Sequence, residues 1–254
     1  MSVSITARWA RLAIVLAGAL ALVGGTVSTS FAANDAKVFI VQGLPGRNLD
    51  ISIDGKSVAK GLKTAAVGGP YATKAGKRKI TFKDNGKVVL ERTFTVAAKS
   101  SWDVVIHLPA SNEDPAVTVF RNDVSPVPRD KARLVVAHVA KVPPADIRVN
   151  GKVLFSNIAN GEALKLTVPV ATYEVKIVPT GETKPVVLGP AKLTVQGGAV
   201  NRVYAVGDPG KKTMNVAVHV ISTGTTGSGK PSDVNTGTGG QLAGRHPLGI
   251  SLTR

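Results

Sequence analysis

The sequence has no cysteine among its 254 residues. A chain without thiols forms no disulfide framework, no thiolate zinc site and no catalytic thiol, and it carries no lipid-modified N-terminal cysteine. Aromatic residues contribute only 4% of the chain, which argues against a platform that stacks bases or sugar rings. The stability of the fold must therefore come from packed apolar cores.

Acidic residues are also scarce, with 16 Asp and Glu against 32 Lys and Arg, which leaves a formal charge of +16. Such a chain is attracted to polyanions or to anionic surfaces. The scarcity of carboxylates leaves few pairs for hydrolytic chemistry, and no Ser, His and Asp pattern stands out. We therefore expect a protein that is not an enzyme and has no cofactor.

The N-terminal stretch "MSVSITARWARLAIVLAGALALVGGTVSTSFAAND" has the pattern of a secretory signal peptide. Arg8 and Arg11 form its positive region, residues 12–23 are uninterruptedly apolar, and Ser30 and Ala32 are the small residues that a signal peptidase recognises. We assign residues 1–32 to the signal peptide. The alternative is an uncleaved anchor, but Gly, Ser and Thr after residue 23 make the segment less apolar than a spanning helix.

Export determines which polyanion is available. Removal of Arg8 and Arg11 lowers the formal charge from +16 to +14, so the mature chain stays basic. Outside a bacterial cell the polyanions are wall polymers, acidic lipids and matrix polysaccharides, and nucleic acid is not an expected partner. We expect an extracellular or envelope-associated protein with no stable membrane span after cleavage.

The chain contains an internal repeat. Residues 38–56, "VFIVQGLPGRNLDISIDGK", align without a gap with residues 134–152, "LVVAHVAKVPPADIRVNGK", at an offset of 96. Further on, "FTVAAKSSWDVVI" corresponds to "LTVQGGAVNRVYAV", with the offset rising to 99. This period is about one immunoglobulin-sized domain.

Each repeat has the pattern of β structure. Asp54-Gly55, Asn85-Gly86 and Asn150-Gly151 predict two-residue hairpin turns between alternating strands. In "TYEVKIV" apolar and charged residues alternate with a period of two, as in a half-buried strand. No helix is expected after the signal peptide.

The predicted fold is all-β, with two tandem Ig-like antiparallel β-sandwich domains that each fold on their own. The first domain covers 36–124, a proline-stiffened linker covers 125–131, and the second domain covers 132–221. Residues 222–254 are rich in Gly, Ser and Thr and predict a flexible tail. This tail has no sorting motif and no apolar segment that would attach the chain to the envelope.

The second repeat resembles the DUF4397 family of exported bacterial repeats, a domain of unknown function typical of high-GC Gram-positive bacteria. Its motifs in this family run "VRVVHASPDAPAVDVYVDGK" and then "LPAGTYEVKV", and His138, Asp146, Asn150, Gly151, Tyr173 and Val175 stand at the matching positions. The resemblance is strong over 133–221 and weaker over 37–124, where Gln42 replaces the histidine. It implies a secreted or surface Ig-like module and brings no established activity.

The four histidines offer no convincing metal site. His138 and His219 lie in the first and last strands of the second repeat, which are often neighbours in sandwiches. A two-histidine site there would lack a third ligand, and imidazoles that bond to the backbone are the commoner arrangement. The aspartates Asp50 and Asp146 are interpreted as turn or strand-edge residues.

The densest basic cluster lies in "KAGKRKITFKDNGK" of the first repeat. Its members are Lys74, Lys77, Arg78, Lys79, Lys83 and Lys87. In a strand, Lys77, Lys79 and Lys83 share one face while Ile80 and Phe82 point inward. The cluster is either an anion-binding surface or a solvated edge whose lysines prevent sheet aggregation.

Two function classes follow. The first is an exported non-catalytic module that associates with anionic wall polymer or with another surface protein. The alternative is an extracytoplasmic small-molecule-binding or sensory protein, which requires a deep pocket. Enzymatic activity is the least supported.

The signal peptide gives the first testable prediction. Cleavage after Ala32 satisfies the small-residue rule, whereas cleavage after Ala33 puts the bulky Phe31 at the third position before the cut. N-terminal sequencing of the exported protein should therefore begin at Ala33, or at Asn34 if the neighbouring site is used. Recovery of an intact Met1 terminus from the extracellular fraction would contradict the assignment.

Overall fold

The computed structural model describes residues 34–111 and 113–224. The predicted signal peptide and most of the predicted tail lie outside these residues. The described strands are β1 Ala36–Gln42, β2 Asn48–Ile53, β3 Lys56–Lys63, β4 Val67–Thr73, β5 Gly76–Asp84, β6 Lys87–Val96, β7 Ser101–His107, β8 Ala116–Arg121, β9 Lys131–Ala140, β10 Ala145–Val149, β11 Lys152–Ile158, β12 Ala163–Pro169, β13 Thr172–Pro179, β14 Leu188–Thr194, β15 Ala199–Gly207 and β16 Asn215–Ser222.

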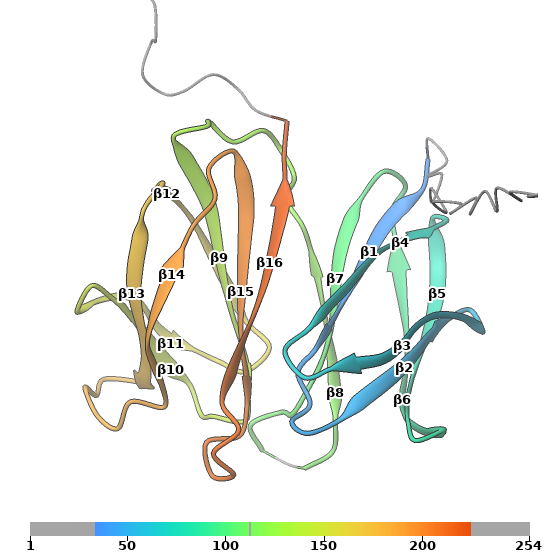
Figure 1. Ribbon diagram of the computed structural model, residues 1–254, viewed down its shortest axis with the longest axis horizontal. Helices are drawn as coiled ribbons and strands as arrows, with labels where there is room; N and C mark the ends of the chain where they lie inside the picture. Colours follow the sequence, from blue (N-terminus) through green and yellow to red (C-terminus); the bar gives the residue numbers. More distant parts are fainter. Residues whose placement is uncertain (1–33, 112, 225–254) are drawn as a thin grey trace, which may run out of the picture. The chain divides into compact units, whose positions relative to one another are not determined.

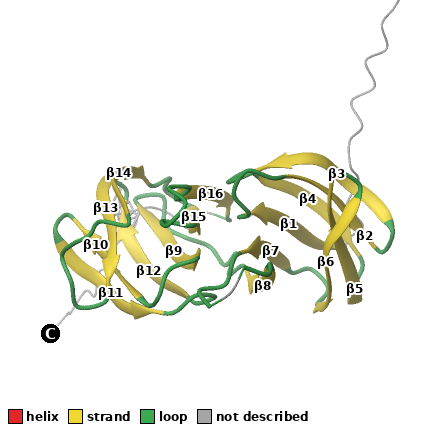
Figure 2. Cartoon of the chain, turned by 90° about the horizontal axis from the view of Figure 1, so that it is seen from below, coloured by secondary structure: helices red, strands yellow, loops and turns green. Residues whose placement is uncertain are grey.

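The described part of the chain contains strands and loops and no helix (Figure 2). The all-β prediction is thereby confirmed. Within the same residues, no helix is long and apolar enough to cross a membrane.

The first sandwich is made of two four-stranded sheets (Figure 1). Sheet A has the order β4-β1-β7-β8 and sheet B the order β3-β2-β5-β6. Alternate side chains of both sheets point into one apolar core, because successive residues of a strand face opposite sides. The buried core residues are Ala36, Val38, Ile40, Leu44, Leu49, Ile51, Ile53, Ile80, Phe82, Phe94, Val96, Val104, Ile106 and Leu108.

The second sandwich repeats this topology. Sheet C has the order β12-β9-β15-β16 and sheet D the order β11-β10-β13-β14, so each strand of the first sandwich has its counterpart eight strands later. The core between sheets C and D is built mainly of Ala, Val, Leu and Ile. The repeat found in the sequence is therefore a repeat of complete sandwiches.

One strand pair in each sandwich differs from the purely antiparallel prediction. β1 pairs with β7 in parallel, and β9 pairs with β15 in parallel. The cause is topological, since the first strand of each repeat inserts between its fourth and seventh strands. The short hairpins that a sequence reveals do not report this long-range pairing.

The three predicted hairpin turns are confirmed. Asp54, Asn85 and Asn150 have φ near +50° and the glycines that follow have φ near +80°. Both central residues of a type I′ turn require positive φ, which Asn, Asp and Gly tolerate best. These turns fix the registers of the β2-β3, β5-β6 and β10-β11 hairpins.

The repeated aspartates stabilise a bulge in the neighbouring strand. The Gly61 amide donates to Oδ1 of Asp50 at 2.8 Å, and the Asn157 amide donates to Oδ1 of Asp146 at 2.9 Å. Gly61 and Asn157 both have positive φ, at 61° and 55°. Asp146 is buried and also accepts from a second amide, that of Gly181, at 3.0 Å.

The outward faces of sheets A and C pack against each other. A third apolar cluster joins side chains of β1 and β7 with side chains of β9, β15 and β16: Val41, Val105, Ala137, Val139, Tyr204, Val206 and Ala217. As a result, all nine residues of β15 are buried. Val203 and Ala205 face the core between sheets C and D, and Tyr204 and Val206 face sheet A. The described residues of both sandwiches fall within one compact unit.

A polar network crosses this interface around the fully buried carboxylate of Asp103. Its Oδ1 accepts from the Asn122 amide at 2.7 Å, and its Oδ2 accepts from the Tyr204 hydroxyl and lies 2.9 Å from Nδ1 of His219. Oδ2 also lies 3.4 Å from Nε of Arg202, an ion-pair distance without hydrogen-bond geometry. Four partners, from β15, β16 and the loop after β8, thus surround one carboxylate.

Burial raises the pKa of the Asp103 carboxyl, but the hydrogen bond from His219 and the charges of His219 and Arg202 outweigh it, so the pKa is lowered. A carboxyl with a lowered pKa in the folded state stabilises that state above the unfolded pKa, near 3.8. This contribution is lost as the pH falls through the folded pKa.

The buried Arg202 side chain is held from both sandwiches. Nη1 donates to Oδ1 of Asn122 at 2.7 Å, and the guanidinium lies 5.1 Å from the ring centroid of Phe120 and 5.5 Å from that of Tyr204. An arginine over an aromatic face gains a cation–π attraction that increases when water is excluded.

The predicted linker, 125–131, packs against its surroundings. Val127 is buried, and Arg133 donates to the Asp123 and Ser125 carbonyls. Hydrogen bonds from Ser125 lower the pKa of Asp123 to about 2, with further help from Lys165 and Arg133. The connection between the sandwiches is therefore anchored at its first residues.

The repeated aspartates provide a matched pair of variants. Asp146→Ala removes two amide partners from a buried site and should lower the free energy of unfolding by about 3 kcal/mol. Asp50→Ala removes one partner at an exposed site and should cost about 1 kcal/mol. Urea denaturation of the two variants measures both, and equal losses would show that burial of Asp146 does not matter.

The buried ion pair of Asp103 and Arg202 predicts that the losses of unfolding free energy caused by replacing each residue do not add. Asp103→Ala or Arg202→Met leaves the other charge buried and should each cost about 3–5 kcal/mol of unfolding free energy, whereas the double variant should cost much less than the sum. Lys165→Ala, which breaks the exposed contact with Asp123, is the control and should cost under about 1 kcal/mol. Additive losses at Asp103 and Arg202 would refute this account of the interface.

Candidate functional site

The predicted basic cluster is divided between two faces of sheet B. Lys77, Lys79 and Lys83 of β5 are exposed on the outward face, while Ile80 and Phe82 are buried in the core. The alternation expected from the sequence is thus present. Lys74 is exposed in the turn before β5, and Lys87 is the first residue of β6, opposite Asp84 in the register of the β5-β6 hairpin.

Arg78 has a structural contact that the sequence does not reveal. Its Nη1 lies 2.7 Å from Oδ2 of Asp54, and its Nη2 donates to the Ala75 carbonyl. The Lys79 amide donates to Oδ1 of Asp54, and this bond together with the Arg78 side chain lowers the pKa of the Asp54 carboxyl. The side chain of Arg78 therefore holds the Asp54-Gly55 turn and does not join the lysines of the outward face.

Lys79 is also partly neutralised. Its Nζ lies 2.7 Å from Oε2 of Glu91 on β6, and the Thr81 hydroxyl donates to the other carboxylate oxygen. The bond from Lys79, followed by that from Thr81, lowers the pKa of Glu91. Lys77 and Lys83 are the members of the outward stripe for which no ion pair is observed among the described residues.

A depression of about 220 Å³ lies beside Lys83 on the outward face of sheet B. Lys60 of β3 and Lys83 of β5 contribute ammonium groups, and Ser52 and Ser57 contribute hydroxyls. Asp50 also lines it, but one carboxylate oxygen is used by the Gly61 amide. The residues of the depression can donate hydrogen bonds to a ligand that carries both anionic and hydroxyl groups.

The second sandwich does not reproduce this arrangement. The pairing registers make Lys83 equivalent to Val178, because Asp50 faces Lys83 across β2 and β5 while Asp146 faces Val178 across β10 and β13. Val178 is fully buried. At the same offset, Ser156 replaces Lys60. The basic depression is thus specific to the first sandwich.

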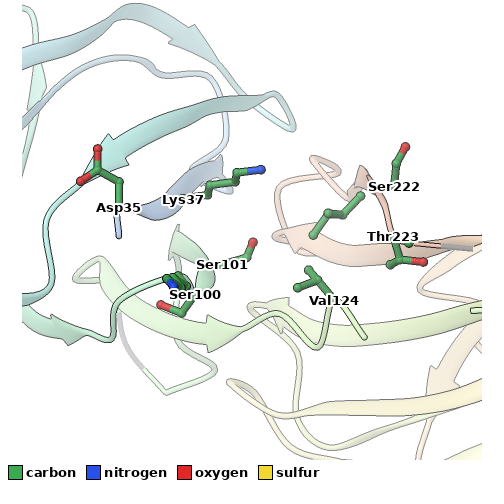
Figure 3. A pocket seen from close by; sticks show the side chains of 10 residues that line it. Asp35, Lys37, Ser100, Ser101, Val124, Ser222 and Thr223 are labelled. Atoms are coloured by element: carbon green, nitrogen blue, oxygen red, sulfur yellow. The ribbon is translucent and has the colours of Figure 1, made fainter. Parts of the chain in front are cut away.

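A larger pocket of about 480 Å³ is lined by residues from the starts of β1 and β7 and from the end of β16 (Figure 3). It contains two cations and one acid, with hydroxyl groups on its walls: Asp35, Lys37, Lys99, Ser100, Ser101, Val124, Ile221, Ser222, Thr223 and Gly224. None of these residues belongs to the predicted basic cluster. The pocket suits a hydroxylated ligand better than a strongly anionic one, since Asp35 offsets one of its lysines.

The structure does not bring His138 and His219 together. β9 and β16 are separated by β15. His138 is paired in register with Ala205, which points into the core, and its Nε2 lies 3.0 Å from the Val142 carbonyl. His219 instead contacts Asp103 on the opposite face of sheet C. Across 34–111 and 113–224, no group of three or more potential metal ligands is found.

Some residues of the basic depression could have been predicted from the sequence. Lys60 follows the Asp54-Gly55 turn by a few residues, so pairing β3 with β2 would have placed it near the predicted lysines. The buried ion pair of the interface, Asp103 and Arg202, could not be predicted in this way. Each of these residues lies in a strand whose alternation predicts an exposed charge. Only the contact between two sandwiches makes them buried partners.

Comparison with known protein families gives a match over part of the chain. The family model of DUF4397, described as a domain of unknown function, matches residues 36–144. This match covers the first sandwich and β9, whereas the sequence motifs place the stronger resemblance on 133–221. No curated protein matches the chain.

Among solved structures, the chain is similar to the one titled "The Bacillus anthracis TIE protein". The identity is 16% and the TM-score 0.23. The alignment covers 68% of this chain and 34% of that structure, so the chain spans about a third of its length.

Proposed function

We propose that this chain, which matches DUF4397 over residues 36–144, is an exported non-catalytic module that binds anionic polymer of the cell envelope. The observation that carries the proposal is the basic depression on the outward face of sheet B, where Lys60 and Lys83 flank two hydroxyl side chains. A polymer of phosphate or carboxylate groups joined by hydroxylated units offers the complementary acceptors and donors.

The surroundings of the depression support contact with an extended polymer. Lys77 and Lys79 continue the outward face of β5 beyond Lys83, so successive anionic groups of one chain meet successive ammonium groups. Each exposed contact contributes little, about 0.2–1 kcal/mol. Binding would therefore be weak at each lysine and would gain strength from many simultaneous contacts.

The packing of the two sandwiches leaves this surface accessible. Sheets A and C use their outward faces for the interface, whereas the outward face of sheet B carries exposed polar and charged residues on β2, β5 and β6. The signal peptide pattern and the mature charge of +14 agree with a role outside the membrane. We propose no catalytic step and no cofactor.

The proposal predicts a charge-dependent interaction that specific lysines carry. Lys60→Ser, Lys77→Ser and Lys83→Ser together should weaken retention of the mature protein on purified cell walls about tenfold, because three exposed contacts of this kind sum to roughly 1.4 kcal/mol. These positions exclude Arg78, so the Asp54 turn is preserved. Sedimentation with cell walls measures the retained fraction.

The matched control removes the same charge from the second sandwich, at the exposed residues Lys131, Lys152 and Lys184. It should reduce retention much less. Retention of the unmodified chain should also fall between 0.1 and 1 M salt, because the Debye length shrinks from about 10 to about 3 Å. Equal effects of the two triple variants, or retention that does not depend on salt, would point to a protein partner instead.

A further inference from the structure

The core of the second sandwich is incompletely filled. A cavity of about 200 Å³ lies between sheets C and D. Its lining is apolar apart from one lysine and consists of Leu134, Val136, Ile147, Val149, Val175, Ile177, Leu188, Ala191, Lys192, Leu193, Val203, Ala205, Val216 and Val218. Protein interiors are normally packed as densely as organic crystals, so side chains around such a space lack contacts.

The cavity arises from side chains that are smaller than their equivalents in the first sandwich. The pairing registers of the two repeats define these equivalents. Val136, Val149, Val175, Ile177, Leu193 and Ala205 stand where the first sandwich has Ile40, Ile53, Ile80, Phe82, Phe94 and Ile106. Leu134, which is larger than Val38, replaces only a small part of the lost volume.

The cavity reaches the edge of the sandwich. Its lining includes residues of β14 and β16, which are the edge strands of sheets D and C. Val218 on β16 is 46% exposed although it belongs to the lining. Lys192 on β14 is exposed as well. An apolar chain that enters between these strands would leave its charged end at the edge of β14, where Lys192 stands beside its register partner Glu174, a carboxylate that already pairs with Lys176.

We propose that this cavity binds the alkyl chain of an anionic amphiphile, with the anionic head group beside Lys192. If one methylene fills about as much space as a water molecule, about 30 Å³, the cavity accommodates roughly six or seven carbons. Fatty acids and the chains of anionic lipids share this chemistry. The site is separate from the basic depression of sheet B and does not depend on the function proposed above.

Octanoate is a suitable probe because its chain matches the cavity and its carboxylate can meet Lys192. Titration of the mature chain by isothermal calorimetry should show saturable binding. Val136→Ile with Ala205→Ile restores the residues found at the equivalent positions of the first sandwich. This filled variant should unfold at the same temperature or higher and bind octanoate at least tenfold more weakly.

Val88→Ile is the matched control, since it makes the same type of enlargement at a residue that is 56% exposed on β6. It should bind octanoate like the unmodified chain. If the double variant does not unfold cooperatively, Val149→Ile alone fills part of the cavity and tests the same point. Octanoate binding that survives filling, or that is never saturable, overturns the proposal.

Two further measurements test whether Lys192 contacts the anionic head group and whether the ligand is a free fatty acid or a lipid. Lys192→Gln should weaken binding of octanoate and leave binding of octanol unchanged, and an equal effect on both would remove Lys192 from the proposal. Competition between octanoate and dihexanoylphosphatidylglycerol distinguishes a free fatty acid from a lipid. Retention of the filled variant, Val136→Ile with Ala205→Ile, on cell walls should not change. Failure of the amphiphile-binding proposal can therefore be distinguished from failure of the polymer-binding proposal.

Discussion

The buried carboxylate of Asp103 is the constraint on which the arrangement of the two sandwiches depends. A charge withdrawn from water is tolerated only when opposite charge and hydrogen-bond donors surround it. Asp103 obtains these donors from its own sandwich through Asn122 and from the other through Arg202, Tyr204 and His219. Sliding sheet A over sheet C by one residue pair would separate Asp103 from the three partners that the second sandwich provides. The apolar cluster between sheets A and C holds the two sandwiches together, and the polar network around Asp103 fixes how the two sheets are aligned.

The interface joins equivalent positions of the repeat. The parallel pairings place Phe39 beside Asp103 and Val135 beside Arg202, so Asp103 and Arg202 are equivalent residues that meet each other. A two-fold symmetric dimer contacts itself in this way. Two copies of the first sandwich would oppose Asp103 with Asp103, whereas the actual pair is complementary. The difference between the repeats at this position therefore favours pairing of unlike sandwiches.

Local features of the fold could be predicted from the sequence, and long-range ones could not. Turn chemistry at Asp54-Gly55 and alternation around Ile80 identify hairpins and inward residues because they depend on neighbours in the chain. The parallel β1-β7 pair depends on where a strand inserts, and no local pattern encodes it. The same holds for Arg78, whose partner Asp54 lies 24 residues away. For this reason the sequence predicts the outward orientation of Lys77, Lys79 and Lys83, which the structure shows, but it does not reveal that Arg78 turns to Asp54.

The two repeats differ in how they use the same framework. Where the first sandwich exposes Lys83 on sheet B, the second buries Val178 on sheet D. Where the first fills its core with Phe82 and Ile106, the second has Ile177 and Ala205 and retains a cavity. Because the outward faces of sheets A and C cover each other, the sheet faces that remain open for a binding surface are those of sheets B and D. Divergence at those places gives each sandwich a different surface chemistry without disturbing the interface that holds them together.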